Sequence, residues 1–378
     1  MGRSPGAALG TRAKSRVIAA TTNRSAVTSR LPDPAFWRDR RVFLTGHTGF
    51  KGAWLGLWLH RLGARVHGFA LPPESSSLAA DLGTAHLVST HGDIRDPAAL
   101  AAAVAAADPE IVLHLAAQSL VRVSYRAPID TFATNVMGTA HVIEAARHAP
   151  RVRALVCVTS DKCYENREWS RAYRESDALG GHDPYSASKA CAEILAASWR
   201  RSFLTDRTPP LALATARAGN VIGGGDWAAD RLIPDCIRAF VAGRTVAIRN
   251  PRATRPWQHV LEPLCGYLIL AETLFDRGTD ASAAWNFGPP AADVRPVADV
   301  VARLAQTWGD GAAWRIDAAP QPHEAGTLAV DAARARARLG WRPRLTLETA
   351  LDWTARWYRA GTDPARLVLR DIESYEIL

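Results

Sequence analysis

Tyr185 and Lys189 stand four residues apart in the stretch DPYSASKA, and a phenol beside an amine can transfer protons. Residues with this spacing share one face of a helix, which would place the lysine ammonium next to the phenol. A free phenol has a pKa of about 10 and is a poor base at neutral pH, but a nearby cation lowers that pKa. The pair could therefore take a proton from a hydroxyl group, although the same spacing is common on solvated helix surfaces.

Glycines mark a second candidate site in the stretch GHTGFKG, which follows an apolar run and precedes a helical pattern. Glycines at these places let the backbone turn tightly and approach a pyrophosphate, and the next helix supplies N–H donors. An ordinary turn between a strand and a helix is the alternative. We predict a dinucleotide site formed by Gly46, Thr48, Gly49, Phe50, Lys51, Gly52, Asp93, Ile94, Ala116, Ala117, Tyr185 and Lys189.

The choice between NAD and NADP is left open by this loop. The second predicted strand ends at Leu71 without the acidic residue that binds a ribose 2′-hydroxyl, and the next acid is Glu74. No arginine stands there for a 2′-phosphate. Asp93 could bond the adenine amino group, or it could cap the helix that starts at Pro97.

Lysine is scarce in this chain. Of the 46 basic residues, four are lysines: Lys14, Lys51, Lys162 and Lys189. At position 189 a compact ammonium could bond both Tyr185 and a ribose hydroxyl, whereas the planar fork of arginine would aim its donors differently. Lys51 lies in the glycine loop and Lys162 follows an apolar strand pattern. Three of the four lysines therefore coincide with candidate sites.

Strand-like apolar stretches alternate with helical patterns around these motifs. Strands are predicted at residues 40–46, 65–71, 87–93, 111–116, 154–159, 211–221 and 285–288, and helices at 51–64, 97–107, 128–148 and 185–203. This alternation predicts an α/β protein with a Rossmann-type doubly wound parallel sheet and helices on both faces.

Three regions are expected along the chain. Residues 1–36 are rich in Ala, Ser, Thr and Arg and are predicted to be a disordered extension. They could also result from a start codon assigned too early or, less readily, be an organellar targeting peptide. Residues 37–225 would form the dinucleotide-binding domain, to which segments around 255–290 return. Residues 226–378 would mainly form a smaller C-terminal lobe that binds the substrate.

The overall composition argues against several classes of protein. Hydrophobic residues make up 48% and charged residues 22%, and no apolar run approaches the ~20 residues of a membrane-spanning helix. Much of the net charge of +9 lies in the N-terminal segment, without a basic stripe that would favour nucleic acid. The five cysteines have no metal-type spacing, which predicts free thiols in a reducing cytoplasm and no metal site.

Taken together, these motifs resemble the extended short-chain dehydrogenase/reductase family over residues 40–358. The matching positions are Gly46, Gly49, Gly52, Asp93, Ala116, Ala117, Asn135, Ser160, Tyr185 and Lys189. The resemblance implies that Ser160 bonds the sugar hydroxyl that Tyr185 deprotonates. It also implies a homodimer or homotetramer formed through the helices that flank Tyr185.

Asp161 and Lys162 follow Ser160 at the predicted end of the fifth strand, where such sheets face their ligand crevice. Epimerases of the family need only the Ser, Tyr and Lys set, whereas dehydratases also need an acid and a base. The stretches TSDKCY, LAAQSLVRVSY, ARAGNVIGGGDWA and RPWQHV resemble the nucleotide-sugar 4,6-dehydratase branch that acts on CDP-glucose. A surface ion pair is the alternative interpretation of Asp161 and Lys162.

The resemblance implies a redox-neutral elimination that converts CDP-glucose to CDP-4-dehydro-6-deoxyglucose and water, with NAD as the cofactor. Tyr185 would take the 4-hydroxyl proton as hydride leaves C4. Lys162, with a pKa lowered by burial and nearby positive charge, would remove the C5 proton. Asp161 would protonate the departing C6 hydroxyl before hydride returns to C6.

Residues of the substrate lobe are assigned less directly. Arg231 and Arg255 are candidate clamps for the diphosphate, because one guanidinium group can bind two phosphate oxygens at once. Asn220 could bond the sugar or a phosphate, and Gln118 could touch the hexose. Each has an ordinary alternative as a surface charge or a turn residue. Trp227 and Trp257 could line the pocket, whereas His323 and Glu324 receive no role.

Two alternative functions are compatible with the same motifs. One is another NAD-dependent nucleotide-sugar dehydratase or an epimerase, which Asp161 and Lys162 disfavour. The other is a dinucleotide-binding protein without catalysis, acting as a sensor or scaffold. The intact set of Ser160, Tyr185 and Lys189 argues against it.

Overall fold

The computed structural model describes residues 2, 29–204, 207–317, 319, 325–361 and 363–378, and a parallel seven-stranded sheet forms its centre. The strands run in the order β11-β6-β5-β4-β1-β2-β3. Their bounds are β1 (Arg41–Thr45), β2 (Arg65–Ala70), β3 (Val88–His91), β4 (Ile111–His114), β5 (Ala154–Val158), β6 (Ala212–Ala218) and β11 (Ala284–Phe287). The chain winds outward from β1 in one direction and from β4 in the other, so the predicted doubly wound fold is confirmed.

Helices cover both faces of the sheet, because successive residues of a strand point to opposite sides. Val42 and Leu44 of β1 belong to a core shared with α2 and α10, whereas Phe43 belongs to a core shared with α4, α7 and α8. The helices of this part are α2 (Phe50–Arg61), α3 (Leu78–Leu82), α4 (Pro97–Ala107), α5 (Val121–Arg126), α6 (Pro128–Phe132), the π-helical η1 (Ala133–Met137), α7 (Gly138–His148), the 3₁₀ turn η2 (Asp161–Cys163), α8 (Pro184–Ser202) and α10 (Leu261–Arg277).

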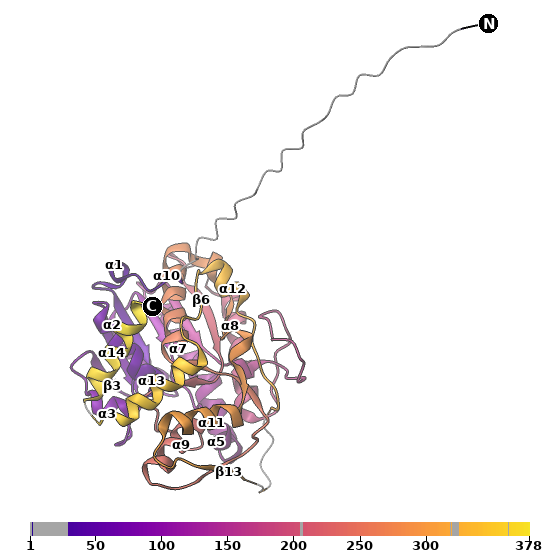
Figure 1. The fold of residues 1–378 in the computed structure, drawn as a ribbon. Helices are drawn as coiled ribbons and strands as arrows, with labels where there is room; N and C mark the ends of the chain where they lie inside the picture. The colour runs from indigo at the N-terminus through magenta and orange to yellow at the C-terminus, as the bar shows by residue number, and fades with distance from the viewer. Residues whose placement is uncertain (1, 3–28, 205–206, 318, 320–324, 362) are drawn as a thin grey trace.

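A second, smaller core lies at the lower end of the molecule, where Figure 1 shows α9, α11 and β13 together. Its strands pair in small sheets: β8 with β13 in parallel, and β9 with β12 in antiparallel fashion. The remaining elements are β7 (Val221–Ile222), α9 (Leu232–Val241), β8 (Val246–Ile248), β9 (Thr254–Pro256), β10 (Gln258–His259), η3 (Gly278–Ala281), η4 (Ala291–Asp293), β12 (Val294–Pro296), α11 (Val297–Trp308), β13 (Trp314–Ile316), α12 (Ala333–Arg338), α13 (Leu347–Arg359) and α14 (Pro364–Glu376).

Parts of residues 226–378 belong to the core of the large sheet, and α10 lies within the segments around 255–290 that were expected to return to it. α10 is buried along nearly its whole length in the core of the large sheet, and α14 packs against α2 and α3. Figure 1 accordingly shows the yellow C-terminal helix beside α2. The C-terminal segment therefore crosses the smaller lobe and then returns to the Rossmann domain.

Residues 29–36 were expected to belong to a disordered extension, but the structure gives them defined contacts. Arg30 pairs with Glu272 of α10 at 2.5 Å, and the Asp33 amide and the Trp37 indole donate to the same carboxylate at 2.8 and 2.7 Å. The short helix α1 (Pro34–Trp37) buries Trp37 completely. The rest of the predicted extension, residues 3–28, lies outside the described residues.

Within the described residues, no helix is both long and apolar enough to cross a membrane. The same part of the chain contains no cluster of three or more His, Cys, Asp or Glu side chains arranged to hold a metal ion.

Candidate functional site

A cavity of about 750 Å³ opens at the carboxyl edge of the sheet, between the two cores. This is the position at which doubly wound sheets bind their ligands. The predicted site residues that line it are Gly46, Thr48, Gly49, Phe50, Lys51, Gly52, Asp93, Ile94, Ala116, Ala117, Ser160, Asp161, Lys162, Tyr185, Lys189, Asn220, Arg231 and Arg255.

The glycine loop brings two backbone segments closer than a side chain would permit. A Cβ on Gly52 would stand 2.0 Å from the Gly46 carbonyl oxygen, and a Cβ on Gly46 would stand 2.6 Å from the Ala116 amide nitrogen. Gly46 also has a φ of +76°, which favours glycine. α2 begins directly after Gly49, which has no side chain to cap the first N–H groups. The loop therefore fits a pyrophosphate, which such N–H groups bind.

Asp93 lines the same cavity and is not the cap of the following helix. Asp96 caps α4 by accepting from the amides of Ala98 and Ala99 at 3.0 Å. The Asp93 carboxylate instead accepts hydrogen bonds from Arg95, at 2.8 Å from its backbone amide and 2.6 Å from its guanidinium. These hydrogen bonds lower the pKa of Asp93, so its charge is already paired.

Ser160, Asp161 and Lys162 come together at the end of β5, as expected. The Ser160 hydroxyl accepts from the Lys162 amide at 3.2 Å, which starts the turn η2, and donates to Asp161 Oδ1 at 3.1 Å. Asp161 is 2% exposed, and its Oδ2 has no hydrogen-bond partner among the described residues. An unpaired buried carboxylate oxygen on a cavity wall is suited to a ligand hydroxyl. Lys162 is half-buried.

The first turns of α8 present Tyr185 and Lys189 to the cavity. Asp183 caps this helix by accepting from the Ser186 amide at 2.9 Å, and Pro184 occupies the first helical position. Both side chains are buried, and the Lys189 ammonium donates to the Val158 carbonyl of β5 at 3.4 Å. The expected meeting of the phenol, amine and carboxyl groups around one cavity is therefore present.

The pKa of Tyr185 is raised, whereas the sequence predicted that a nearby cation would lower it. Burial raises the pKa of the phenol to about 12, and a hydrogen bond with Ser160 offsets only part of this. Burial also lowers the pKa of Lys189 to about 8 and, with Arg231 nearby, lowers that of Lys51 to about 7. Desolvation thus outweighs the hydrogen bond with Ser160 and the positive charge of Arg231, which lower the pKa of Tyr185.

The four predicted substrate residues have different surroundings. Arg231 donates to Asp226 at 2.9 Å and to the Ser119 hydroxyl at 2.8 Å, so its guanidinium is held on the cavity wall. Arg255 is 5% exposed and donates to the Thr254 carbonyl at 2.9 Å, so it is not a solvated surface charge. Asn220 also lines the cavity.

Gln118 is the exception, because the structure does not place it on the cavity wall. Its amide nitrogen donates to the Thr131 hydroxyl at 2.9 Å, and its carbonyl oxygen accepts from the Leu120 amide at 2.6 Å. The Asn135 side chain accepts a hydrogen bond from the Gln118 backbone amide and donates one to the Gln118 carbonyl, both at 2.9 Å. This side chain braces the loop after β4, and its expected contact with a hexose stays a prediction.

Several residues of the cavity were missed by the sequence reasoning. Asp230 lies between two arginines, 3.3 Å from Arg249 and 3.6 Å from Arg122. In a chain this rich in arginine, single arginines carry no local signal, and their pairing depends on distant segments. The other missed polar residues of the wall include Ser119, Asp226, Asn250 and Asp317.

The aromatic and C-terminal candidates also differ from one another. Trp257 lines the cavity, whereas Trp227 packs edge-on against Tyr358 with ring centroids 4.9 Å apart. His323 and Glu324 lie outside the described residues.

The fold and the site define the class of protein. Residues 42–280 match the model of the NAD dependent epimerase/dehydratase family, and this chain belongs to that family. The resemblance seen in the motifs is therefore confirmed.

Two nucleotide-sugar 4,6-dehydratases are similar to this chain in sequence. The chain is 48% identical over 351 residues to a CDP-glucose 4,6-dehydratase of Salmonella typhimurium, covering 91% of this chain and 98% of that protein. It is 26% identical to dTDP-glucose 4,6-dehydratase 1 of Escherichia coli, over 85% of this chain and 93% of that one.

Solved structures with NAD bound share this fold, and two of them serve as examples. A dTDP-glucose 4,6-dehydratase of Streptomyces venezuelae is 25% identical and superimposes with a TM-score of 0.73, covering 85% of this chain and 97% of that chain. A UDP-glucose 4-epimerase of Thermus thermophilus superimposes with a TM-score of 0.74 at 21% identity, over 85% of this chain and all of that one, and it shows the shared fold.

The buried amine of Lys189 should make the stability of the protein depend on pH. Its folded pKa of about 8 lies below the ordinary 10.5, so the charged form is disfavoured by folding. This destabilisation is fully present below the folded pKa and disappears as the pH rises to about 10.5. We expect Lys189→Met to raise the melting temperature at pH 7, with a gain that shrinks toward pH 10.

Thermal unfolding of the variant and the wild type at both pH values measures this difference. Arg201→Met removes an exposed cation from the same helix and should show no such trend. A gain in melting temperature for Lys189→Met that is equal at pH 7 and pH 10 would contradict a lowered pKa of Lys189.

Proposed function

We propose that this protein is a 4,6-dehydratase that converts CDP-glucose to CDP-4-dehydro-6-deoxyglucose and water. The observation that carries the proposal is the gathering of Ser160, Asp161, Lys162, Tyr185 and Lys189 on one cavity. An epimerase would not need the acid and base that Asp161 and Lys162 can provide. The 48% identical relative named CDP-glucose 4,6-dehydratase supports the choice of nucleotide.

NAD fits the glycine loop and the neighbouring strand ends. When bound, it would accept a hydride from the sugar and return it. The amide groups at the start of α2 would hold the pyrophosphate, because the bare Gly49 leaves them free of a side-chain cap. The Lys189 ammonium would bond the ribose hydroxyl beside the nicotinamide, as the resemblance to the extended short-chain dehydrogenase/reductases implies.

Tyr185 would act as the base at the 4-hydroxyl of the glucose ring. Because burial raises the pKa of the phenol to about 12 with Lys189 already in place, the phenolate depends on additional positive charge in the site. An oxidised nicotinamide would supply this charge. Ser160, already hydrogen-bonded to Tyr185, would orient the hydroxyl for proton transfer.

Elimination would follow from the ketone formed at C4, which acidifies the neighbouring C5–H bond. Lys162, as a neutral amine, would take the C5 proton, and the electron pair of that bond would form the C5–C6 double bond. Asp161, in its protonated form, would give a proton to the departing C6 hydroxyl, which leaves as water. The hydride from C4 would then be returned to C6 while the protonated amine of Lys162 gives a proton back to C5, so no net oxidant is consumed.

Arginines of the cavity would hold the diphosphate of the substrate. Arg231 is fixed by Asp226 and Ser119, and Arg255 by the backbone of β9, so both guanidinium groups are positioned before binding. Pre-positioned donors lose little freedom when a ligand arrives. We assign the two residues to the diphosphate clamp, with Asn220 beside the sugar.

We also propose that the protein works in the cytoplasm as a homodimer or homotetramer. Its five cysteines are all unpaired, which suits a reducing compartment. Three apolar side chains are exposed on helices that pack together, at 80% for Ile129 of α6, 52% for Met137 of η1 and 58% for Ile194 of α8. An apolar face of this kind favours association with a second copy.

A panel of nucleotide sugars tests the substrate assignment. We expect the purified protein with NAD to turn over CDP-glucose at least tenfold faster than UDP-, GDP- or dTDP-glucose. The 4-keto product is followed by the absorbance that develops in alkali, and its mass falls by one water. If the protein turned over only another of these nucleotide sugars, the nucleobase of the substrate would be reassigned. A 4-epimer as product would make the protein an epimerase.

Lys162→Ala tests the base at C5. We expect turnover to fall at least 100-fold, because general-base catalysis typically contributes about 10²–10⁴. In deuterium oxide, wild-type product should carry deuterium at C5, read by mass spectrometry and NMR. Tyr185→Phe serves as the comparison, since it should block oxidation at C4 before any exchange. Normal turnover and normal exchange in Lys162→Ala would remove this residue from the base role.

Ile194→Glu tests the subunit interface. A buried charge at a subunit interface opposes association, so the variant should shift toward a monomer in light scattering. Val241→Glu on α9 is the matched control, because Val241 is 68% exposed on a different part of the molecule. An unchanged mass for Ile194→Glu would place the interface elsewhere.

A further inference from the structure

A buried ion pair lies behind the cavity, between α8 and β6. Glu193 and Arg217 are 2.7 Å apart, with side chains that are 1% and 3% exposed. Neither residue is part of the cavity wall. A charged pair this deeply buried is costly to desolvate and contributes little to stability over an apolar replacement, so its presence calls for another explanation.

The contacts of Glu193 join the helix of the proposed catalytic pair to two strands. One carboxylate oxygen accepts from the Thr159 hydroxyl of the β5 end at 2.5 Å, and the other from the Thr215 hydroxyl of β6 at 2.7 Å. Thr159 directly precedes Ser160. On α8, Tyr185, Lys189 and Glu193 follow one another at steps of four residues and therefore share one face.

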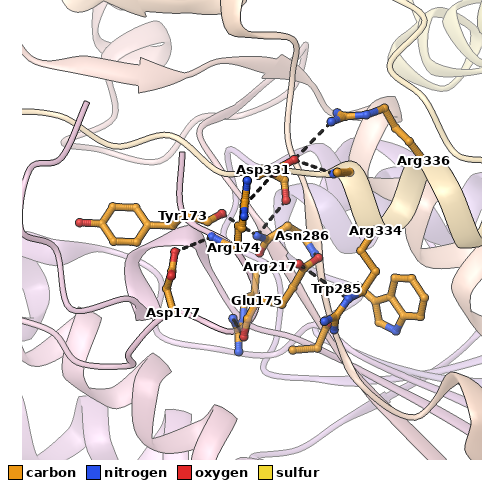
Figure 2. A network of polar contacts seen from close by, with 12 residues as sticks. Tyr173, Arg174, Glu175, Asp177, Arg217, Trp285, Asn286, Asp331, Arg334 and Arg336 are labelled. Carbon is orange, nitrogen blue, oxygen red and sulfur yellow. Dashed lines mark hydrogen bonds and ion pairs between the residues drawn. The ribbon is translucent and has the colours of Figure 1, made fainter. Parts of the chain in front are cut away.

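Arg217 extends this connection to the loop after β5. Its guanidinium donates to the Tyr164 hydroxyl at 2.8 Å and to the Glu175 carbonyl at 3.4 Å. The Tyr164 hydroxyl donates in turn to Asn286 of β11 at 2.7 Å. Figure 2 shows Arg217, Glu175 and Asn286 close together in this network.

Asn286 carries the network to the C-terminal part of the chain. Its backbone amide donates to the Glu175 carboxylate at 3.0 Å, and its side-chain amide to the carbonyls of Tyr173 and Asp331 at 3.0 and 3.1 Å. The loop that holds Tyr164 and Tyr173 is thus fixed to β6, β11 and the segment before α12. Figure 2 shows Tyr173, Asn286 and Asp331 in this network. Glu193 is the point at which this network reaches the helix of Tyr185 and Lys189.

We propose that Glu193, held by Arg217, is a positioning residue that keeps Lys189 protonated and aligned with Tyr185 and Ser160. The proposal rests on the proposed function, because it gives Lys189 a task in that reaction. Glu193 touches neither substrate nor cofactor, and it acts through the side chains of Lys189 and Thr159. The bonds to β5 and β6 fix the distance between α8 and the strand end that carries Ser160.

The charges around Lys189 support this role. Burial lowers the pKa of Lys189 most, and Cys157 and then Glu193 raise it in part. Burial raises the pKa of Glu193 itself, but Arg217 and the threonine hydroxyls outweigh this, so the carboxylate is ionised. The other ionisable groups that act on these two residues are two thiols and an imidazole that burial keeps neutral, a second lysine and a second arginine: Cys157, Cys163, His114, Lys51 and Arg200.

Removing the carboxylate charge should therefore make Lys189 lose its proton at a lower pH. Glu193→Gln alone leaves Arg217 buried without its partner, which can unfold the protein. The double variant Glu193→Gln, Arg217→Met removes both charges and is expected to fold. Glu193→Asp keeps the charge and is the conservative rescue.

The scarcity of lysine makes the test direct. With four lysines in the chain, ¹³Cε-labelled lysine gives four side-chain signals, and Lys189→Met identifies the one of interest. We expect the titration midpoint of Lys189 to fall by about one pH unit or more in the double variant and to return toward the wild-type value in Glu193→Asp. An unchanged midpoint in the double variant would overturn the proposal.

Kinetics provide a second readout. The double variant should lose about 10–100-fold in kcat with a change in KM below about twofold, because alignment acts on the reacting groups and not on the diphosphate. The alkaline limb of its pH profile should move in the same direction as the midpoint. Glu272→Gln is the control: this carboxylate is also buried and paired with an arginine, but away from the cavity, so it should lower stability and leave the pH profile in place.

The two readouts separate the inference from the function on which it rests. The titration of Lys189 needs no substrate, so a shifted midpoint supports the link between Glu193 and Lys189 even if another nucleotide sugar is the substrate. A normal midpoint with an altered kcat would reduce Glu193 to a structural residue and overturn the proposal.

Discussion

Desolvation at the carboxyl edge of the sheet is the constraint on which the site depends. The cavity is walled by buried ionisable groups, and burial is the largest influence on the pKa of Tyr185, Lys189 and Lys51. In such surroundings a single charge acts strongly on its neighbours, because little water screens it. The same burial that disfavours the phenolate makes the site responsive to the positive charge of a bound ligand. Small rearrangements of charge can then change which group holds a proton.

The backbone provides the rigidity that such a site requires. Parallel strands place the loops after β1, β4, β5 and β6 around one crevice, and each loop carries a different part of the site. Close contacts at Gly46 and Gly52 leave no room for a side chain, so the first loop is held against the loop after β4. α8 is fixed at its start by Asp183 and along its length by Glu193. Proton transfer between groups from separate elements is feasible because these elements are held in register.

Local patterns predicted much of this arrangement, and long-range pairings account for what they missed. Strands and amphipathic helices have periods that a sequence shows directly, as do the glycine loop and the spacing of Tyr185 and Lys189. α10 was not predicted as one long helix, because it is buried on nearly all sides and has no polar stripe. Gln118 was expected in the site, but Thr131 and Leu120 take up its amide. The contacts of residues 29–36 depend on Glu272, more than 200 residues away along the chain.

The division of labour between arginine and lysine follows from the same physics. A guanidinium stays charged in any protein environment, so Arg217 can serve as a permanent partner for a buried carboxylate. An amine loses its proton readily when desolvated, as the lowered pKa values of Lys189 and Lys51 indicate. A chain that uses arginine nearly everywhere would therefore keep lysine where the proton has to be shared or released. On this argument, the placement of Lys162 beside Asp161 is chemically meaningful even though the side chain is only half-buried, because arginine at that position could not act as a base.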